Sequence, residues 1–149
     1  MKSTIFNALR ACSLYLLVAV ACVSAQSSTW LIANVPFDFV VRNQHFPAGA
    51  YSVTVSRAQG SLLIRGEDNG SATFALSYAA QRDKAERYPT LVFNRYGDRY
   101  FLSQVWPVGS DSGRALNPSK MEEEVASRTG KPEIVALLAS GSKVHRPTR

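Results

Sequence analysis

The chain has little of the side chains that thiol and metal chemistry need. It contains two cysteines and two histidines. Both cysteines, Cys12 and Cys22, lie within the first 25 residues, which we expect to be removed from the working protein. The remaining chain would then form no disulfide, no thiolate metal site and no cysteine nucleophile. Its fold must be stabilised by an apolar core, which a chain of about 124 residues is long enough to form.

The two histidines, His45 and His145, are far apart in the sequence. Zinc sites use about three or four clustered ligands, so two scattered imidazoles without cysteine predict no metal site. A serine–histidine–acid triad stays open on the sequence alone, because its members assemble in space and not in sequence order. No serine stands in a nucleophile-elbow pattern, however. We predict no catalytic residue, no cofactor and no enzymatic activity.

A secretory leader occupies the start of the chain. Lys2 and Arg10 precede an apolar run over residues 11–23, and small residues follow as far as Ala25. A charged start, an apolar stretch of about 7–15 residues and a small-residue exit are typical of a signal peptide. We expect residues 1–25 to be cleaved from the domain between Ala25 and Gln26. The protein would then be secreted or periplasmic, with no transmembrane span after processing.

A lipid anchor at Cys22 is the less favoured alternative. The segment Val18–Cys22 is a permissive match to a bacterial lipoprotein cleavage box, with the small Ala21 just before the cysteine. Ala19, however, stands where leucine is usual. An acyl chain at Cys22 would hold the protein at a membrane without a span.

The charge balance indicates a mildly basic surface. The formal charge of the whole chain is +6, and part of it lies in the leader and in the final residues Lys143, Arg146 and Arg149. Internal charges alternate in sign without a basic stripe, so we predict no nucleic-acid partner. We expect weak attraction to anionic envelope polymers. Residues 26–149 are predicted to form one β-rich domain, with a flexible basic tail over 141–149.

Alternating apolar and polar residues predict strands over most of this domain. Strands are expected at 30–35, 37–41, 51–56, 62–65 and 72–78. The turn-forming sequence Phe46–Gly49 predicts that residues 37–56 form one hairpin. Asn69-Gly70 is a strong signal for a tight turn, and it predicts a second hairpin joining 62–65 to 72–78.

A third hairpin is predicted over residues 89–106, and two registers compete for it. A turn centred on Tyr96-Gly97 pairs Phe93 with Tyr100 and Leu91 with Leu102. A turn centred on Gly97-Asp98 instead pairs Asn94 with Phe101. Matched cross-strand pairs contribute about 0.2–1 kcal/mol each, which favours the first register. It places Leu91, Phe93, Tyr100 and Leu102 on one face, the predicted core face.

One helix is predicted late in the chain, over residues 119–128. Ser119 and Glu122 have the spacing of a capping box, and Gly130 and Pro132 end the helix. Helix-dipole electrostatics explain the three consecutive glutamates without a calcium site. The short apolar run 134–139 is compatible with strand or helix, and we favour a strand. The fold expected is mainly β: a small antiparallel barrel or strongly curled sheet of seven to eight strands, with one short helix packed on it.

The predicted binding site lies at the tip of the third hairpin. Arg95, Tyr96, Asp98 and Arg99 cluster there, and Trp106 lies further along the same strand. Aromatic rings beside arginines can stack on sugars, and arginines can bind carboxylates through paired hydrogen bonds. The alternative is an ordinary turn, with Arg95 and Asp98 as a cross-strand ion pair.

Three phrases carry a resemblance that covers most of the domain: Val35–Phe39, Pro47–Val53 and Arg95–Leu102. The chain resembles a group of small exported proteins of acidobacterial type with no assigned activity. The resemblance implies export and a compact β fold, but no substrate. We predict a non-enzymatic structural, adhesive or binding module of the cell envelope or extracellular space, with an anionic envelope polymer as a partner. The alternative is a carrier that holds a small apolar ligand inside a barrel.

Overall fold

The computed structural model describes residues 28–57, 59–140 and 142–145. The predicted leader, with Cys22 and the cleavage site at Ala25 and Gln26, lies outside these residues. Within the segment predicted as a flexible tail, Ser142–His145 form a strand, and the other tail residues are not described.

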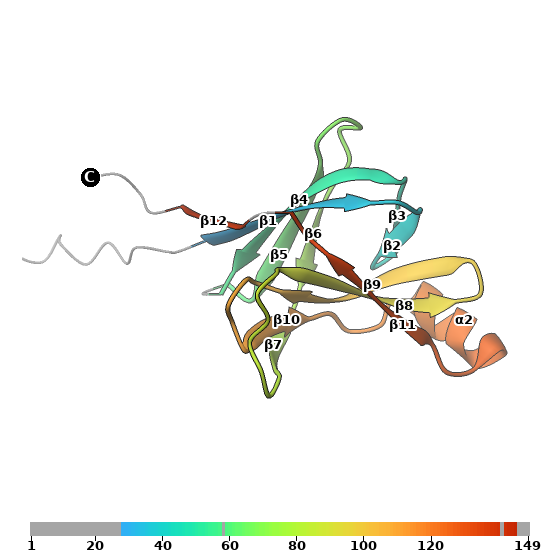
Figure 1. Ribbon diagram of the computed structural model, residues 1–149. Helices are drawn as coiled ribbons and strands as arrows, with labels where there is room; N and C mark the ends of the chain where they lie inside the picture. Colours follow the sequence, from blue (N-terminus) through green and yellow to red (C-terminus); the bar gives the residue numbers. More distant parts are fainter. Residues whose placement is uncertain (1–27, 58, 141, 146–149) are drawn as a thin grey trace, which may run out of the picture.

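The chain folds into two sheets that lie one above the other (Figure 1). Sheet A consists, in spatial order, of β12 (Ser142–His145), β1 (Ser28–Val35), β4 (Gly49–Ser56), β5 (Ser61–Gly66) and β6 (Ala72–Leu76). Sheet B consists of β11 (Glu133–Leu138), β8 (Thr90–Tyr96), β9 (Arg99–Trp106), β10 (Ser112–Ala115) and β7 (Tyr78–Gln81), with β2 (Phe39–Val41) and β3 (Gln44–Phe46) attached. β2 runs parallel to β9 and antiparallel to β3.

The prediction of a mainly β fold with one helix is confirmed, but the barrel or strongly curled sheet is wrong. Among the residues that the structure describes, neither sheet closes, and the strands number twelve where seven or eight were expected. The chain leaves sheet A at Leu76 and enters sheet B at Tyr78, so consecutive strands belong to different sheets. Two open sheets bury their apolar faces against each other, which makes closure unnecessary for a core.

The main core lies between the sheets, and alternation along the strands fills it. Tyr51, Val53 and Val55 of β4 are each at most 1% exposed, while the residues between them are half-buried. Sheet B contributes Leu91 and Phe93 from the facing side. Side chains from both sheets form one cluster, so the interior is filled by the protein itself.

The predicted hairpin over residues 37–56 is wrong. Residues 39–41 pair with 44–46 in a short hairpin of their own, and β2 then joins β9 of sheet B. β4 pairs with β1 and β5 in sheet A. The Phe46–Gly49 segment therefore carries the chain from one sheet to the other instead of folding it back.

The third hairpin forms as predicted, but in the other register. Asn94 pairs with Phe101 and Phe93 with Leu102, and a β-bulge at Ser103 then brings Leu91 opposite Val105. Gly97 has φ +65° and occupies the first position of the two-residue turn, where glycine is favoured. The turn geometry sets the register. Because the two registers differ by two residues, the predicted face still points to the core.

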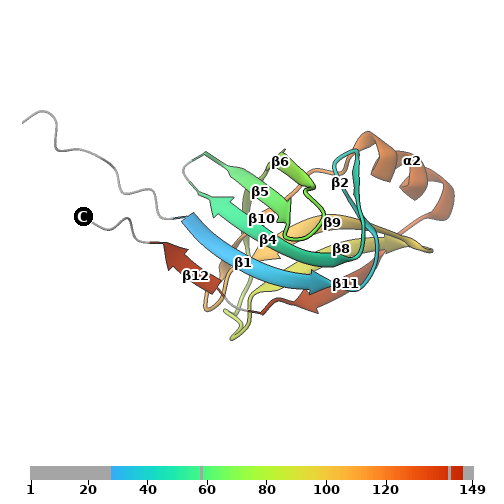
Figure 2. The same cartoon turned by 90° about the horizontal axis from the view of Figure 1, so that it is seen from above.

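Three further elements are confirmed. β5 and β6 form the hairpin at Asn69-Gly70, and the late apolar run forms β11, which pairs with β8. The helix α2 (Lys120–Thr129) has Ser119 as its N-cap, with the serine oxygen accepting a hydrogen bond from the Glu122 amide. Figure 2 shows α2 beside β2, on the opposite side of sheet B from sheet A.

A second, smaller core lies under this helix. Val40, Tyr96 and Phe101 are buried on the outer face of sheet B, and Met121 and Val125 of α2 pack against them. The helix thus covers one end of this face. Further along the same face, Ile134 and Leu138 of β11 are exposed.

Candidate functional site

The hairpin tip places Arg95, Asp98 and Arg99 near one another, but Arg95 is already bonded. Its Nη1 donates to the Glu133 carboxylate at 3.2 Å, and its Nε donates to the Gly97 carbonyl at 2.8 Å. Its guanidinium also lies over the Tyr100 ring, 5.4 Å from the centroid. The alternative ion pair between Arg95 and Asp98 is thus replaced by one to Glu133. Asp98 and Arg99 are exposed, whereas the Arg95 side chain, which is 40% exposed, is already bonded.

Tyr96, the second predicted site residue, faces the helix. It is 8% exposed and packs edge-on against Phe101, with ring centroids 5.8 Å apart. Burial raises the pKa of its hydroxyl above the usual value, and the nearby Glu122 carboxylate raises it further. Tyr96 therefore belongs to the small core under α2.

Trp106 lies at the opposite end of β9 from the tip. At roughly 3.3 Å per residue, the strand separates it from Arg99 by about 23 Å. The Arg82 guanidinium covers its ring at 4.7 Å from the centroid, and the indole N–H donates to the Gln104 side chain at 2.9 Å. Trp106 is 5% exposed, so its face is not free to stack on a ligand.

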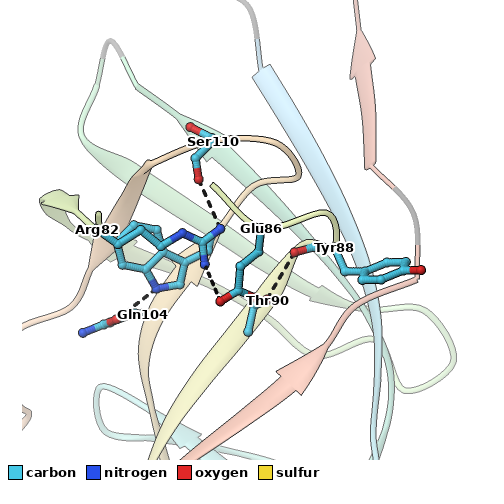
Figure 3. Close-up of polar contacts among 7 residues, drawn as sticks. Arg82, Glu86, Tyr88, Thr90, Gln104 and Ser110 are labelled. Atoms are coloured by element: carbon cyan, nitrogen blue, oxygen red, sulfur yellow. Dashed lines mark hydrogen bonds and ion pairs between the residues drawn. The ribbon is translucent and has the colours of Figure 1, made fainter. Parts of the chain in front are cut away.

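Arg82, the first residue after β7, also contacts residues of two loops (Figure 3). Its Nη2 donates to the Ser110 carbonyl at 3.1 Å, and its Nη1 lies 3.6 Å from the Glu86 carboxylate. Its Nε is buried without a hydrogen-bond partner among the described residues. Arg82 thus links both loops to the buried indole, through its hydrogen bond, its ion pair and its stacking on the ring.

The helix α2 itself carries a buried carboxylate. Glu122 is 5% exposed, and its Oε1 accepts a hydrogen bond from the Asn94 amide at 2.7 Å. Burial raises the pKa of this carboxyl and the neighbouring Glu123 adds to the rise, whereas the hydrogen bond from Asn94 opposes it. The folded protein thus favours the protonated carboxyl more than the unfolded chain does.

Replacing Glu122 with glutamine is expected to raise the free energy of unfolding at neutral pH. The folded state binds more protons than the unfolded state between the usual pKa and the raised one, so wild-type stability falls as pH rises through that window. Glutamine keeps the acceptor for Asn94 and removes the charge. The variant's advantage over wild type, measured by urea unfolding from pH 4 upward, should grow with pH and then level off.

The matched control is Glu124→Gln, an exposed position on the same helix. The difference in free energy of unfolding between this variant and wild type should stay nearly constant with pH. A Glu122→Gln protein that is less stable than wild type at neutral pH would show that the helix needs this charge.

A surface pocket of about 320 Å³ lies where three segments meet. They are the β2–β3 turn, the end of β6 and the loop that leads from β10 into α2. Its lining includes the cationic side chains of Arg42 and Lys120 but no carboxylate. Neither cation forms an ion pair with another described residue.

The rest of the lining consists of amide and apolar residues and of Ser119, whose hydroxyl already caps α2. Asn43 and Asn117 contribute side-chain amides, each with donor and acceptor atoms. Leu76, Leu116 and Pro118 contribute apolar surface. Small-ligand sites combine these two kinds of lining, and their volumes begin at about 300 Å³.

Arg42 reaches this pocket from an unfavourable backbone conformation. It stands with Asn43 in a two-residue turn closed by the pairing of Val41 with Gln44, and its φ is +59°. An L side chain is strained there and glycine is not. Such strain is often found at functional positions.

The sequence offered only faint signals for this pocket. Asn43 indicates a turn, and the sequence from Asn117 to Lys120 indicates a helix start beside a cation. Nothing local shows that residues 42–43 and 116–120 meet. The predicted site residues lie elsewhere: at the tip, under α2, and at the far end of β9.

No helix within the described residues has both the length and the apolar character to cross a membrane. Nor do the described residues contain a group of three or more His, Cys, Asp or Glu side chains able to hold a metal ion. His45 is exposed on β3, and the His145 side chain is outside the described part. No protein-family model, no curated protein and no solved structure matches this chain.

Proposed function

We propose that this protein is an exported, non-enzymatic binding module of the cell envelope or extracellular space. The pocket between the β2–β3 turn, the end of β6 and the loop before α2 is the observation that carries this proposal. Two cations without ion-pair partners in the described chain line it. Export rests on the leader sequence of residues 1–25.

The pocket is a better binding site than the hairpin tip because its two cations form no ion pair with another described residue. The guanidinium of Arg95 at the tip already has two hydrogen-bond partners and a ring to stack on. A ligand there would have to displace these contacts or use Arg99 alone. In the pocket, a ligand meets Arg42 and Lys120 without breaking an ion pair between described residues.

A carrier with an apolar interior is less well supported. It requires an empty space between the sheets, and the side chains there, such as Leu31, Phe93 and Val105, are fully buried in one packed cluster. A ligand of this fold would therefore bind in a surface pocket, and at least one side of the ligand would be polar.

The test is non-denaturing mass spectrometry of the mature protein purified from its own cells. The protein is measured as isolated and again after incubation with concentrated small molecules from the same cells. We expect a mass above that of the Gln26–Arg149 chain, falling to the bare mass on denaturation. The same chain carrying Arg42→Gln and Lys120→Gln is the control and should stay bare. A wild-type protein that is bare in both samples contradicts a small-molecule binding role.

A further inference from the structure

We infer that the pocket binds an acidic sugar unit, held by its oxyanion between Arg42 and Lys120. This inference rests on the proposed binding function and names the ligand class for that site. A guanidinium can donate two parallel hydrogen bonds to a carboxylate or phosphate, and an ammonium adds a compact positive charge. Because no carboxylate lines the pocket, an anion entering it meets no like charge from the lining.

The remaining lining matches the body of a sugar. Hydroxyl groups both donate and accept, and so do the side-chain amides of Asn43 and Asn117. The C–H face of a sugar ring is apolar and can pack on Leu76, Leu116 and Pro118. Leu76 is 72% exposed, so covering its side chain removes apolar surface from water. A volume of about 320 Å³ suits one sugar unit better than a long chain of them.

The strained turn strengthens the assignment of Arg42 to the ligand. Glycine at this position would relieve the positive φ, which is unfavourable for an L residue. A binding role for the side chain would account for an arginine at a position where its backbone conformation lowers stability. Arg42→Gly should therefore keep or raise the melting temperature while it weakens ligand binding.

The experiment is a titration of the mature protein with matched sugars, followed by calorimetry and by backbone amide shifts of residues 42, 43, 117 and 120. The probes are glucuronate, glucose 6-phosphate, neutral glucose and inorganic phosphate. We expect at least one charged sugar to bind about tenfold or more tightly than glucose and than inorganic phosphate. The tighter of the two charged sugars identifies the oxyanion as carboxylate or phosphate.

Charge-removing variants locate the site. Arg42→Gln and Lys120→Gln should each weaken binding of the charged sugar by about tenfold or more. Lys131→Gln removes the same charge from an exposed position outside the pocket lining and should change affinity less than about twofold. Thermal unfolding of each variant shows that it is folded.

Two results would overturn the inference. One is glucose or inorganic phosphate binding as tightly as both charged sugars; the other is charged-sugar binding that survives both pocket substitutions. If mass spectrometry of the native protein shows a retained ligand while the charged sugars fail, the binding function stands and the ligand class is wrong. If both experiments find no ligand, both proposals are wrong.

Discussion

Replacing Phe93 with alanine is expected to lower the free energy of unfolding by about 3–5 kcal/mol, the usual cost of truncating a fully buried phenylalanine. Phe93 has no exposed surface and lies between the sheets. Its ring packs edge-on against Phe37 at 5.2 Å and against Phe39 at 5.5 Å. Truncation removes these contacts and leaves a cavity that the surrounding strands cannot fill.

The measurement is urea unfolding followed by tryptophan fluorescence. Phe74→Ala is the matched control, because Phe74 is 64% exposed on β6 and should change stability by less than about 0.5 kcal/mol. If Phe93→Ala is too unstable to purify, Phe93→Leu gives a smaller loss that can still be compared with Phe74→Leu. Equal losses at positions 93 and 74 would contradict the packing described between the sheets.

Replacing Gly113 with alanine is expected to lower stability by about 1–3 kcal/mol through overpacking. Gly113 lies next to Trp106 across the β9–β10 pair, and a Cβ atom there would be 2.4 Å from the indole ring. The ring is rigid, and the Arg82 guanidinium lies over it, 4.7 Å from the ring centroid. The substitution must therefore displace the indole, the guanidinium over it, or the strand.

Ser112→Ala, on the same strand, is the control and should have little effect on stability. In a Trp106→Leu background the ring atoms that meet the new methyl group are absent. The further cost of Gly113→Ala should then nearly disappear, which a double-mutant cycle measures. A cost that stays the same in both backgrounds would show that the backbone, and not the indole, resists the methyl group.

The elements that sequence predicted well are those fixed by neighbouring residues. The Asn69-Gly70 turn and the Ser119 cap each act within a few residues, so the hairpin and the helix formed where they were expected. The inward face of the third hairpin was also right, because alternation survives a shift of two residues. The predicted register was wrong because it was chosen for its apolar cross-strand pairs. In the structure, the Gly97 turn and the bulge at Ser103 determine the pairing instead.

What sequence could not supply was the arrangement of elements in space. The chain between residues 37 and 56 contains good strand and turn signals, yet its strands divide between two sheets. The pocket could not be predicted for the same reason, because Arg42, Leu76 and Lys120 come from segments that are distant in the sequence. Trp106 and Arg99 were grouped because they share a strand, but the length of that strand keeps them apart.

The parallel pairing of β2 with β9 also determines how the molecule must fold. Phe39 pairs with Tyr100, about sixty positions along the chain, while the strands on either side of the β2–β3 hairpin belong to the other sheet. Neither sheet can complete its pairing before residues from both halves of the chain have met. The domain should therefore unfold in one cooperative transition, and its folding rate should be set by this long loop closure instead of by its fast local hairpins.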